Sequence, residues 1–120
     1  MLRIVDYGVG NLGSLVNMCQ RAGMRVGVAE TPADVLGASG LILPGVGSFD
    51  NGIQRLISSN LVDSLTEVVV VKQRPILGVC LGMQMMTEAS DEGVSPGLAW
   101  IRGHVRKFPA SPELRVPHIG

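Results

Sequence analysis

The sequence has 120 residues, 46% of them apolar and 17% charged, and its ten basic residues balance ten acidic ones. This composition is that of one globular domain with a sizeable core, and the lack of net charge gives no reason to bind nucleic acid or an anionic membrane. No apolar run reaches the ~18 residues that a membrane-spanning helix needs, and the amino terminus lacks the core of a signal peptide. Cys19 and Cys80 stand far apart and in no metal-binding pattern. We therefore expect reduced thiols, no metal or other cofactor, and a cytoplasmic location.

Strands and helices are predicted to alternate from the start of the chain. Leu2–Val5 is apolar and favours a strand, and the helix that follows has Asn11 as a cap and Gly23 as a terminator. A second strand covers Arg25–Ala29. Thr31 then caps a short helix that has Pro at its first position.

The rest of the chain repeats this order. Gly40–Leu43 is a third, fully apolar strand, and Pro75–Cys80 is the fourth, followed at once by an apolar helix over Leu81–Ala89. Trp100–Phe108 is interpreted as a strand or a hairpin. Two helices are predicted between the third and fourth strands, the second of them capped by Asn60. Their buried faces are expected to be Phe49, Ile53, Leu56 and Ile57, and then Leu61, Leu65, Val68 and Val69.

Apolar strands that alternate with helices are typical of a parallel sheet covered on both faces. We therefore predict an α/β fold, a doubly wound and mostly parallel sheet with helices on both faces, incomplete at its carboxy terminus. Residues 1–120 are expected to be the amino-terminal part of a single domain. In such folds, ligands bind at the carboxyl ends of the strands.

The fourth strand leads into Gly78-Val-Cys-Leu-Gly82, which is the pattern of a nucleophile elbow with Cys in place of Ser. A lone Cys is more often a buried core residue, and this is our interpretation of Cys19 on the apolar face of the first helix. Cys80 differs because a strand, two glycines and a helix stand where a nucleophile needs them. The N–H of Leu81 is then expected to face the developing oxyanion.

Two glycine-rich segments follow the first and third strands. Leu43-Pro-Gly-Val-Gly-Ser48 leaves the backbone free to present N–H groups to an oxyanion or a substrate carboxylate, and it lacks the Lys of a phosphate-binding loop. Asp6–Gly13 contains Gly-x-Gly-x-x-Gly, with Glu30 at about the ~20-residue distance of dinucleotide-binding proteins. Nucleotide binding is the weaker interpretation, because the other two loops both indicate chemistry at Cys80.

Four segments in order along the chain carry a family resemblance. They are Val5–Ser14, Leu43–Asp50, Pro75–Gln84 and Val116–Gly120, and the segment around the cysteine is the most specific. Together they resemble the glutaminase subunits of imidazole glycerol phosphate synthase, which belong to the triad-type class I glutamine amidotransferases. The resemblance implies hydrolysis of glutamine to glutamate and ammonia through a glutamyl thioester.

The resemblance also implies roles for individual residues. Cys80 would be the nucleophile, Val46, Gly47 and Leu81 would lie around the oxyanion, and Gln84 would help to hold the glutamine.

A partner is implied as well. The ammonia would pass to a barrel-shaped synthase subunit, in a heterodimer that makes imidazole glycerol phosphate and an aminoimidazole carboxamide ribotide in histidine biosynthesis. Asn11 and His118 would face that subunit.

The family pattern has a further part that this sequence does not contain. Family members continue past Pro-His-x-Gly into Trp-Asn and then a His-x-Glu strand, which supplies the general base and its partner. We therefore expect residues 1–120 alone to be nearly inactive, since no group takes the proton of the thiol. His104 and His118 are the only histidines. We assign His104 a structural role on a strand and expect neither to replace the base.

Two other functions stay open at this point. Relatives that resemble this subunit amidate sugars for surface polysaccharides with a different synthase, and Phe49–Gly52 is compatible with either branch. A naturally shortened, catalytically dead relative would serve as a docking module instead. The intact elbow glycines, Cys80 and Gln84 favour the enzyme, because a dead relative has no chemical need for them.

Overall fold

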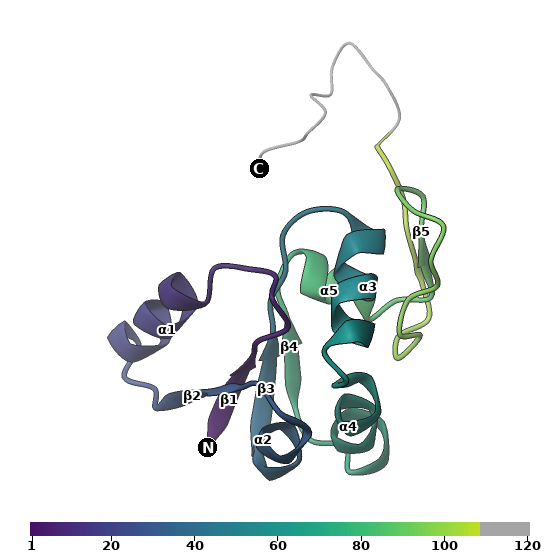
Figure 1. The fold of residues 1–120 in the computed structure, drawn as a ribbon. Coiled ribbons are helices and arrows are strands. Elements are labelled where there is room, and N and C mark those ends of the chain that lie inside the picture. Colours follow the sequence, from purple (N-terminus) through teal and green to yellow (C-terminus); the bar gives the residue numbers. More distant parts are fainter. Residues whose placement is uncertain (109–120) are drawn as a thin grey trace.

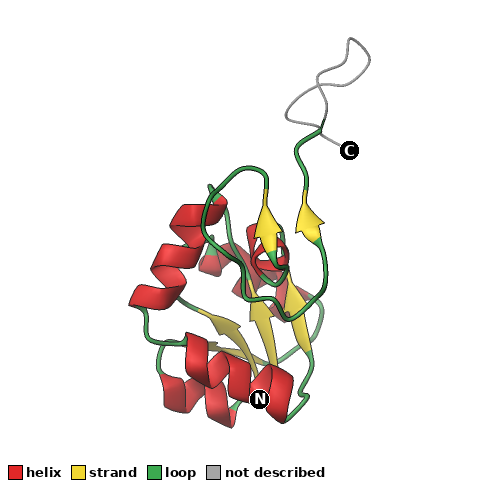
Figure 2. Cartoon of the chain, turned by 90° about the vertical axis from the view of Figure 1, so that its right-hand side faces the viewer, coloured by secondary structure: helices red, strands yellow, loops and turns green. Residues whose placement is uncertain are grey.

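The computed structural model describes residues 1–108. Its larger sheet has four parallel strands in the order β2-β1-β3-β4, and a second sheet pairs β5 with β6 (Figures 1 and 2). The strands are β1 Leu2–Val5, β2 Val26–Ala29, β3 Gly40–Leu43, β4 Ile76–Gly78, β5 Ala89–Ser90 and β6 His104–Val105. The helices are α1 Leu12–Arg21, α2 Pro32–Gly37, α3 Phe49–Ser58, α4 Val62–Thr66 and α5 Leu81–Met85, with a π-helical turn, Glu67–Val71, directly after α4.

The strand order confirms the predicted doubly wound α/β fold. α1 lies on one side of the larger sheet, and α3, α4 and α5 lie on the other (Figure 1). Alternate residues of each strand point to opposite faces of the sheet. Ile4 and Ile42 pack with Cys19 of α1 in a small buried group, the α1 cluster, whereas Val5 and Leu43 pack in the main core on the other face. From β1 the chain continues to β2 on one side, and from β3 to β4 on the other. The strand order therefore reverses between β1 and β3, where open α/β sheets bind their ligands.

The start and the end of α1 and the start of α2 are as the sequence predicts. The Asn11 Oδ1 atom accepts a hydrogen bond from the Ser14 N–H at 3.1 Å at the start of α1. Gly23 follows the end of α1 with a φ of 78°, the left-handed conformation that glycine adopts most readily. The Thr31 side chain caps α2 as expected.

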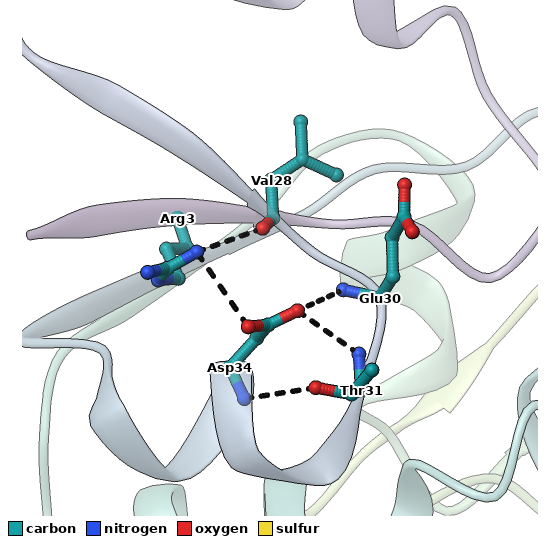
Figure 3. A network of polar contacts seen from close by, with 5 residues as sticks. All are labelled: Arg3, Val28, Glu30, Thr31 and Asp34. Atoms are coloured by element: carbon teal, nitrogen blue, oxygen red, sulfur yellow. Dashed lines mark hydrogen bonds and ion pairs between the residues drawn. The ribbon is translucent and has the colours of Figure 1, made fainter.

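A polar network ties α2 to the sheet (Figure 3). The Asp34 carboxylate accepts hydrogen bonds from the N–H groups of Glu30 and Thr31 at 3.1 and 3.2 Å, and these bonds hold the pKa of Asp34 below its ordinary value. The Arg3 guanidinium on β1 lies 3.9 Å from the same carboxylate and donates to the Val28 carbonyl of β2 at 2.9 Å. Strands β1 and β2 and helix α2 are thereby linked through side chains as well as through the core.

Two predictions on the α3–α4 region are wrong. Asn60 does not cap a helix but takes a φ of 62°, and Leu61 stands at the start of α4 without a side-chain cap. Asn is one of the few residues besides Gly that tolerate this left-handed conformation, so it turns the chain between the two helices. Ile57 is 60% exposed, because it lies one position past Leu56 and beyond the edge of the buried stripe of α3.

The predicted helix over Leu81–Ala89 is too long. α5 ends at Met85, and β5 begins at Ala89. The reason is that residues 97–101 return to the end of α5 and take over its last carbonyl groups. The N–H of Leu98 donates to the Met85 carbonyl at 2.8 Å, and the N–H of Trp100 donates to the next carbonyl at 3.0 Å.

Of the two interpretations of Trp100–Phe108, the strand is right in part and the hairpin is wrong. Only His104–Val105 forms a strand, β6, and it pairs in parallel with β5. A parallel pair cannot be joined by a hairpin turn, and residues 91–103 form the longer connection that it requires.

The α1 side of the sheet is covered only in part. Leu77 on β4 pairs with Ile42 of β3, so it lies on this side, and it is 59% exposed. A hollow of about 240 Å³ lies beside it, lined by apolar side chains that include Leu2, Met24 and Ile42. Within residues 1–108, no helix combines the length and the apolar character needed to cross a membrane.

Candidate active site

Cys80 lies on a sharp turn between β4 and α5. Its backbone angles are φ 52° and ψ −119°, a conformation that costs a residue with a Cβ atom on the order of 1–3 kcal/mol. Such strain persists only where the surroundings fix it, and it is the feature that defines a nucleophile elbow. The backbone of Cys80 therefore has the geometry that the sequence pattern predicts.

The glycines on either side of Cys80 are required by close contacts. A Cβ atom on Gly82 would lie 1.8 Å from the carbonyl oxygen of Leu43, and one on Gly78 would lie 2.6 Å from the Cα of Met83. These neighbours are backbone atoms, which cannot move aside as a flexible side chain would. Any larger residue at either position would open the elbow.

Three loops meet around the thiol at the carboxyl ends of the strands. They line a pocket of about 210 Å³ that lies where the strand order reverses. Gly10 and Asn11 come from the loop after β1, Pro44, Gly45 and Val46 from the loop after β3, and Cys80 from the elbow.

The two cysteines have different environments. Cys80 is exposed, and its side chain makes no capping hydrogen bond to α5. Cys19 is only 5% exposed and packs in the α1 cluster with Ile4 and Ile42. Only Cys80 is accessible to a molecule in the pocket.

The other predicted site residues lie on the loop after β3 and in α5. Val46 lines the pocket, and Gly47 follows it with a φ of 99°. The Leu81 side chain is buried in the core, whereas its N–H is the first of α5 and has no partner within that helix. Gln84 lies one turn further along α5, where its N–H donates to the Cys80 carbonyl at 3.1 Å. Gln84 does not line the pocket, and His118 lies outside the described residues.

Sequence reasoning missed one residue of this region, Tyr7. The Tyr7 side chain is buried, and its hydroxyl donates a hydrogen bond of 2.6 Å to the carbonyl of Pro44. Burial raises the pKa of Tyr7 to about 12. In the sequence, Tyr7 is followed by Gly8 and Gly10, but no motif distinguished it from an ordinary aromatic residue of the core.

Asp50 fixes the segment that follows β5. Its carboxylate, in the first turn of α3, accepts hydrogen bonds from the N–H groups of Val94 and Ser95 at 2.9–3.1 Å. These bonds lower the pKa of Asp50. Residues 93–95 are thereby held against the amino end of α3, which directly follows the loop after β3.

His104 forms a hydrogen bond with Asp91, outside the Cys80 pocket. Its Nε2 lies 2.5 Å from the Asp91 Oδ1, and the contact joins β6 to the end of β5. The hydrogen bond from His104 lowers the pKa of Asp91. His104 does not line the Cys80 pocket. In the part of the chain that the structure describes, no three His, Cys, Asp or Glu side chains gather as metal ligands would.

Known proteins resemble this chain in sequence and in fold. The profile of the family described as Glutamine amidotransferase class-I matches residues 3–115. The chain is 47% identical over its full length to the imidazole glycerol phosphate synthase subunit HisH 2 of Pseudomonas aeruginosa, covering 59% of that protein. It is 45% identical to subunit HisH of Bdellovibrio bacteriovorus, again over the whole chain and covering 60% of the relative.

The fold has a solved counterpart. A chain described as "Crystal structure of glutamine amidotransferase" aligns with a TM-score of 0.68 over 87% of this chain and 55% of its own, at 16% identity. At that identity the likeness concerns the fold. The chain spans about 60% of the length of the curated relatives named above. The family match over most of the sequence confirms the resemblance seen in the motifs, and the chain belongs to the class I glutamine amidotransferase family.

Proposed function

We propose that residues 1–120 form the amino-terminal part of a glutaminase domain that hydrolyses glutamine and supplies ammonia to an imidazole glycerol phosphate synthase in histidine biosynthesis. The observation that carries the proposal is the accessible Cys80 on its strained elbow, beside a pocket built from three loops. The choice of synthase is supported by the two similar proteins from Pseudomonas aeruginosa and Bdellovibrio bacteriovorus, which are named as subunits of imidazole glycerol phosphate synthase.

The chemistry begins at the Cys80 sulfur. The thiolate attacks the side-chain amide carbon of glutamine, an S–C bond forms, and the carbonyl oxygen takes the electron pair. Backbone N–H groups of Val46, Gly47 and Leu81 stabilise this oxyanion, while Gln84 holds the substrate. The C–N bond then breaks, ammonia leaves with an added proton, and water cleaves the thioester to give glutamate.

Proton transfer needs a residue from outside the described region. Within residues 1–108, no His, Asp or Glu lines the Cys80 pocket. We propose that the general base and acid come from the further segment that the relatives carry, which accounts for about 40% of their length. General acid–base help is typically worth ~10²–10⁴-fold in rate.

The partner is proposed to be the synthase subunit, bound in a heterodimer at the mouth of the pocket. Asn11 stands there, exposed, with its side-chain oxygen engaged in capping α1. Ammonia released at Cys80 would then have a short path into the partner. His118 is proposed to contact the same subunit.

The test uses an extended protein, defined as residues 1–120 joined to the remaining segment of the Pseudomonas aeruginosa relative, together with a synthase subunit. Cys80→Ala should abolish glutamine-dependent synthesis, because no thioester forms. Synthesis from added ammonium salt should continue, because the partner needs only free ammonia. Cys19→Ala is the matched control and should retain both activities, since its thiol is buried.

Three results would contradict the proposal. Glutamine-dependent synthesis by Cys80→Ala would exclude Cys80 as the nucleophile. Loss of the ammonia-dependent reaction as well would give Cys80 a structural role. A glutamine-like diazoketone that labels Cys19 instead of Cys80 would reverse the assignment of the two thiols.

A further inference from the structure

We propose that Tyr7 is a positioning residue for glutamine hydrolysis, whose hydroxyl holds the Pro44–Gly45 peptide so that the Gly45 N–H and the backbone after it face the Cys80 pocket. The inference rests on the proposed glutaminase function. It adds to the loop after β1, which already supplies Gly10 and Asn11 to the pocket, a buried residue that acts on the loop after β3.

The contact joins two loops that are distant in sequence. Tyr7 follows β1 and is only 4% exposed, and its hydroxyl donates to the Pro44 carbonyl at 2.6 Å across 37 positions of the chain. Pro44 is the first residue after β3, and it lines the pocket with Gly45 and Val46. A short, buried bond of this kind fixes the direction of a carbonyl group more firmly than a solvated one does.

The direction of that carbonyl decides the direction of the next N–H. In a trans peptide the C=O and N–H bonds point to opposite sides. Because the Pro44 carbonyl is directed inward at Tyr7, the Gly45 N–H is directed away from the core, on the side of the pocket. Among residues 1–108, the Gly45 N–H donates no hydrogen bond to another protein group. It is a donor left free beside the thiol.

The Tyr7 hydroxyl also packs closely against Gly45. A Cβ atom on Gly45 would lie 2.6 Å from the Tyr7 hydroxyl oxygen, 2.9 Å from the Leu81 Cβ and 3.0 Å from the Gly82 nitrogen. Gly45 is therefore held between Tyr7 and the first turn of α5. If the Pro44 carbonyl moved, the distance between the loop after β3 and the elbow would change.

The hydroxyl is a reliable donor across the physiological pH range. Burial raises the pKa of Tyr7 to about 12, so the phenol keeps its proton. Phe at this position would keep the ring in the core but leave the buried Pro44 carbonyl without its donor, which frees the peptide to rotate.

The experiment compares Tyr7→Phe with the parent in the extended protein, bound to the synthase subunit. Glutamine turnover should fall about tenfold in kcat, a fraction of the ~10²–10³-fold caused by deleting an oxyanion donor outright. KM should change little, and ammonia-dependent synthesis should be unchanged. Val68→Ala is the control, since it removes core packing in the π-helical turn and should leave kcat intact.

A pair of thiol reagents separates positioning from general damage. A glutamine-derived aldehyde accepts the Cys80 sulfur at its carbonyl carbon and places the resulting oxyanion among the N–H donors. Iodoacetamide alkylates the same sulfur by displacing iodide and forms no oxyanion. Tyr7→Phe should bind the aldehyde about tenfold more weakly, whereas its alkylation rate should equal that of the parent.

Equal kcat and equal aldehyde affinity in Tyr7→Phe and the parent would overturn the inference. So would a parallel loss of aldehyde binding and alkylation, because that pattern indicates a collapsed site. A parent protein that neither turns over glutamine nor binds the aldehyde would instead refute the proposed function on which this inference rests.

Discussion

At the scale of single residues, the site depends on unusual conformation and burial. Cys80 is held with a φ of 52°, and this strain projects an accessible thiol at the end of β4. Cys19, with the same chemical group, is buried in the α1 cluster. The difference in accessibility between the two cysteines therefore follows from backbone position, not from residue type.

Tyr7 leads to a prediction on alkaline pH. Its folded-state pKa of about 12 exceeds the ordinary 10.0, so the unfolded chain loses the phenolic proton first. The stability that Tyr7 contributes is thus complete below about pH 10 and is lost as the pH rises toward 12, by about 1.4 kcal/mol per pH unit. The free energy of unfolding of the extended protein, measured in urea at about pH 9 and about pH 11, should show this loss.

Tyr7→Phe provides the reference for that measurement. The two proteins share every other titratable side chain, so only the difference between their stability curves reports Tyr7. The difference should shrink as the pH rises. Curves that stay parallel would mean that Tyr7 ionises equally in the folded and unfolded states.

At the scale of elements, the elbow connects β4 to α5 and leaves no room for a side chain at Gly82. Gly82→Ala should lower the free energy of unfolding by ~1–3 kcal/mol or more, because the new Cβ would meet the Leu43 carbonyl oxygen at 1.8 Å. Glutamine turnover should fall with it. Urea denaturation of the extended protein measures the first effect and a glutaminase assay the second.

Gly37→Ala is the matched control for Gly82→Ala. Gly37 ends α2, and a Cβ atom there would meet nothing within 4 Å. Its replacement should leave stability unchanged or raise it by ~0.4–1 kcal/mol, because the unfolded chain loses freedom. If both variants behave alike, the close approach at the elbow does not limit stability.

At the scale of the whole molecule, the two faces of the sheet differ in how well they are covered. The side that carries α3, α4 and α5 has a continuous core, whereas the α1 side has a hollow of about 240 Å³ beside the exposed Leu77. We expect the further segment of the extended protein to cover this side. Residues 1–120 alone should then melt at a lower temperature and turn over almost no glutamine.

Leu77→Gln tests this coverage directly. In the extended protein it should lower the free energy of unfolding by ~1.5–3 kcal/mol, since it would remove a buried leucine. In residues 1–120 alone the effect should stay within about 0.5 kcal/mol. Met18→Gln on α1, where Met18 is 64% exposed, should be neutral in both. Equal losses for Leu77→Gln in the two proteins would show that the segment covers another surface.

The sequence by itself determined the features that depend on near neighbours. The four strands of the sheet follow from apolar runs, the cap at Asn11 and the terminator at Gly23 from positions close to each helix end, and the elbow at Cys80 from glycines two residues away. Their physical causes act within a few residues, so a sequence pattern contains them.

Only the tertiary structure decided what depends on distant partners. α5 stops at Met85 because residues 97–101 take its last carbonyl groups, and β5 pairs in parallel with a strand about 15 residues away. Tyr7 meets the Pro44 carbonyl across 37 positions, a contact that no spacing in the sequence indicates. Packing brings these groups together. Each contact depends on the placement of the whole sheet, so the local pattern of apolar and polar residues does not predict it.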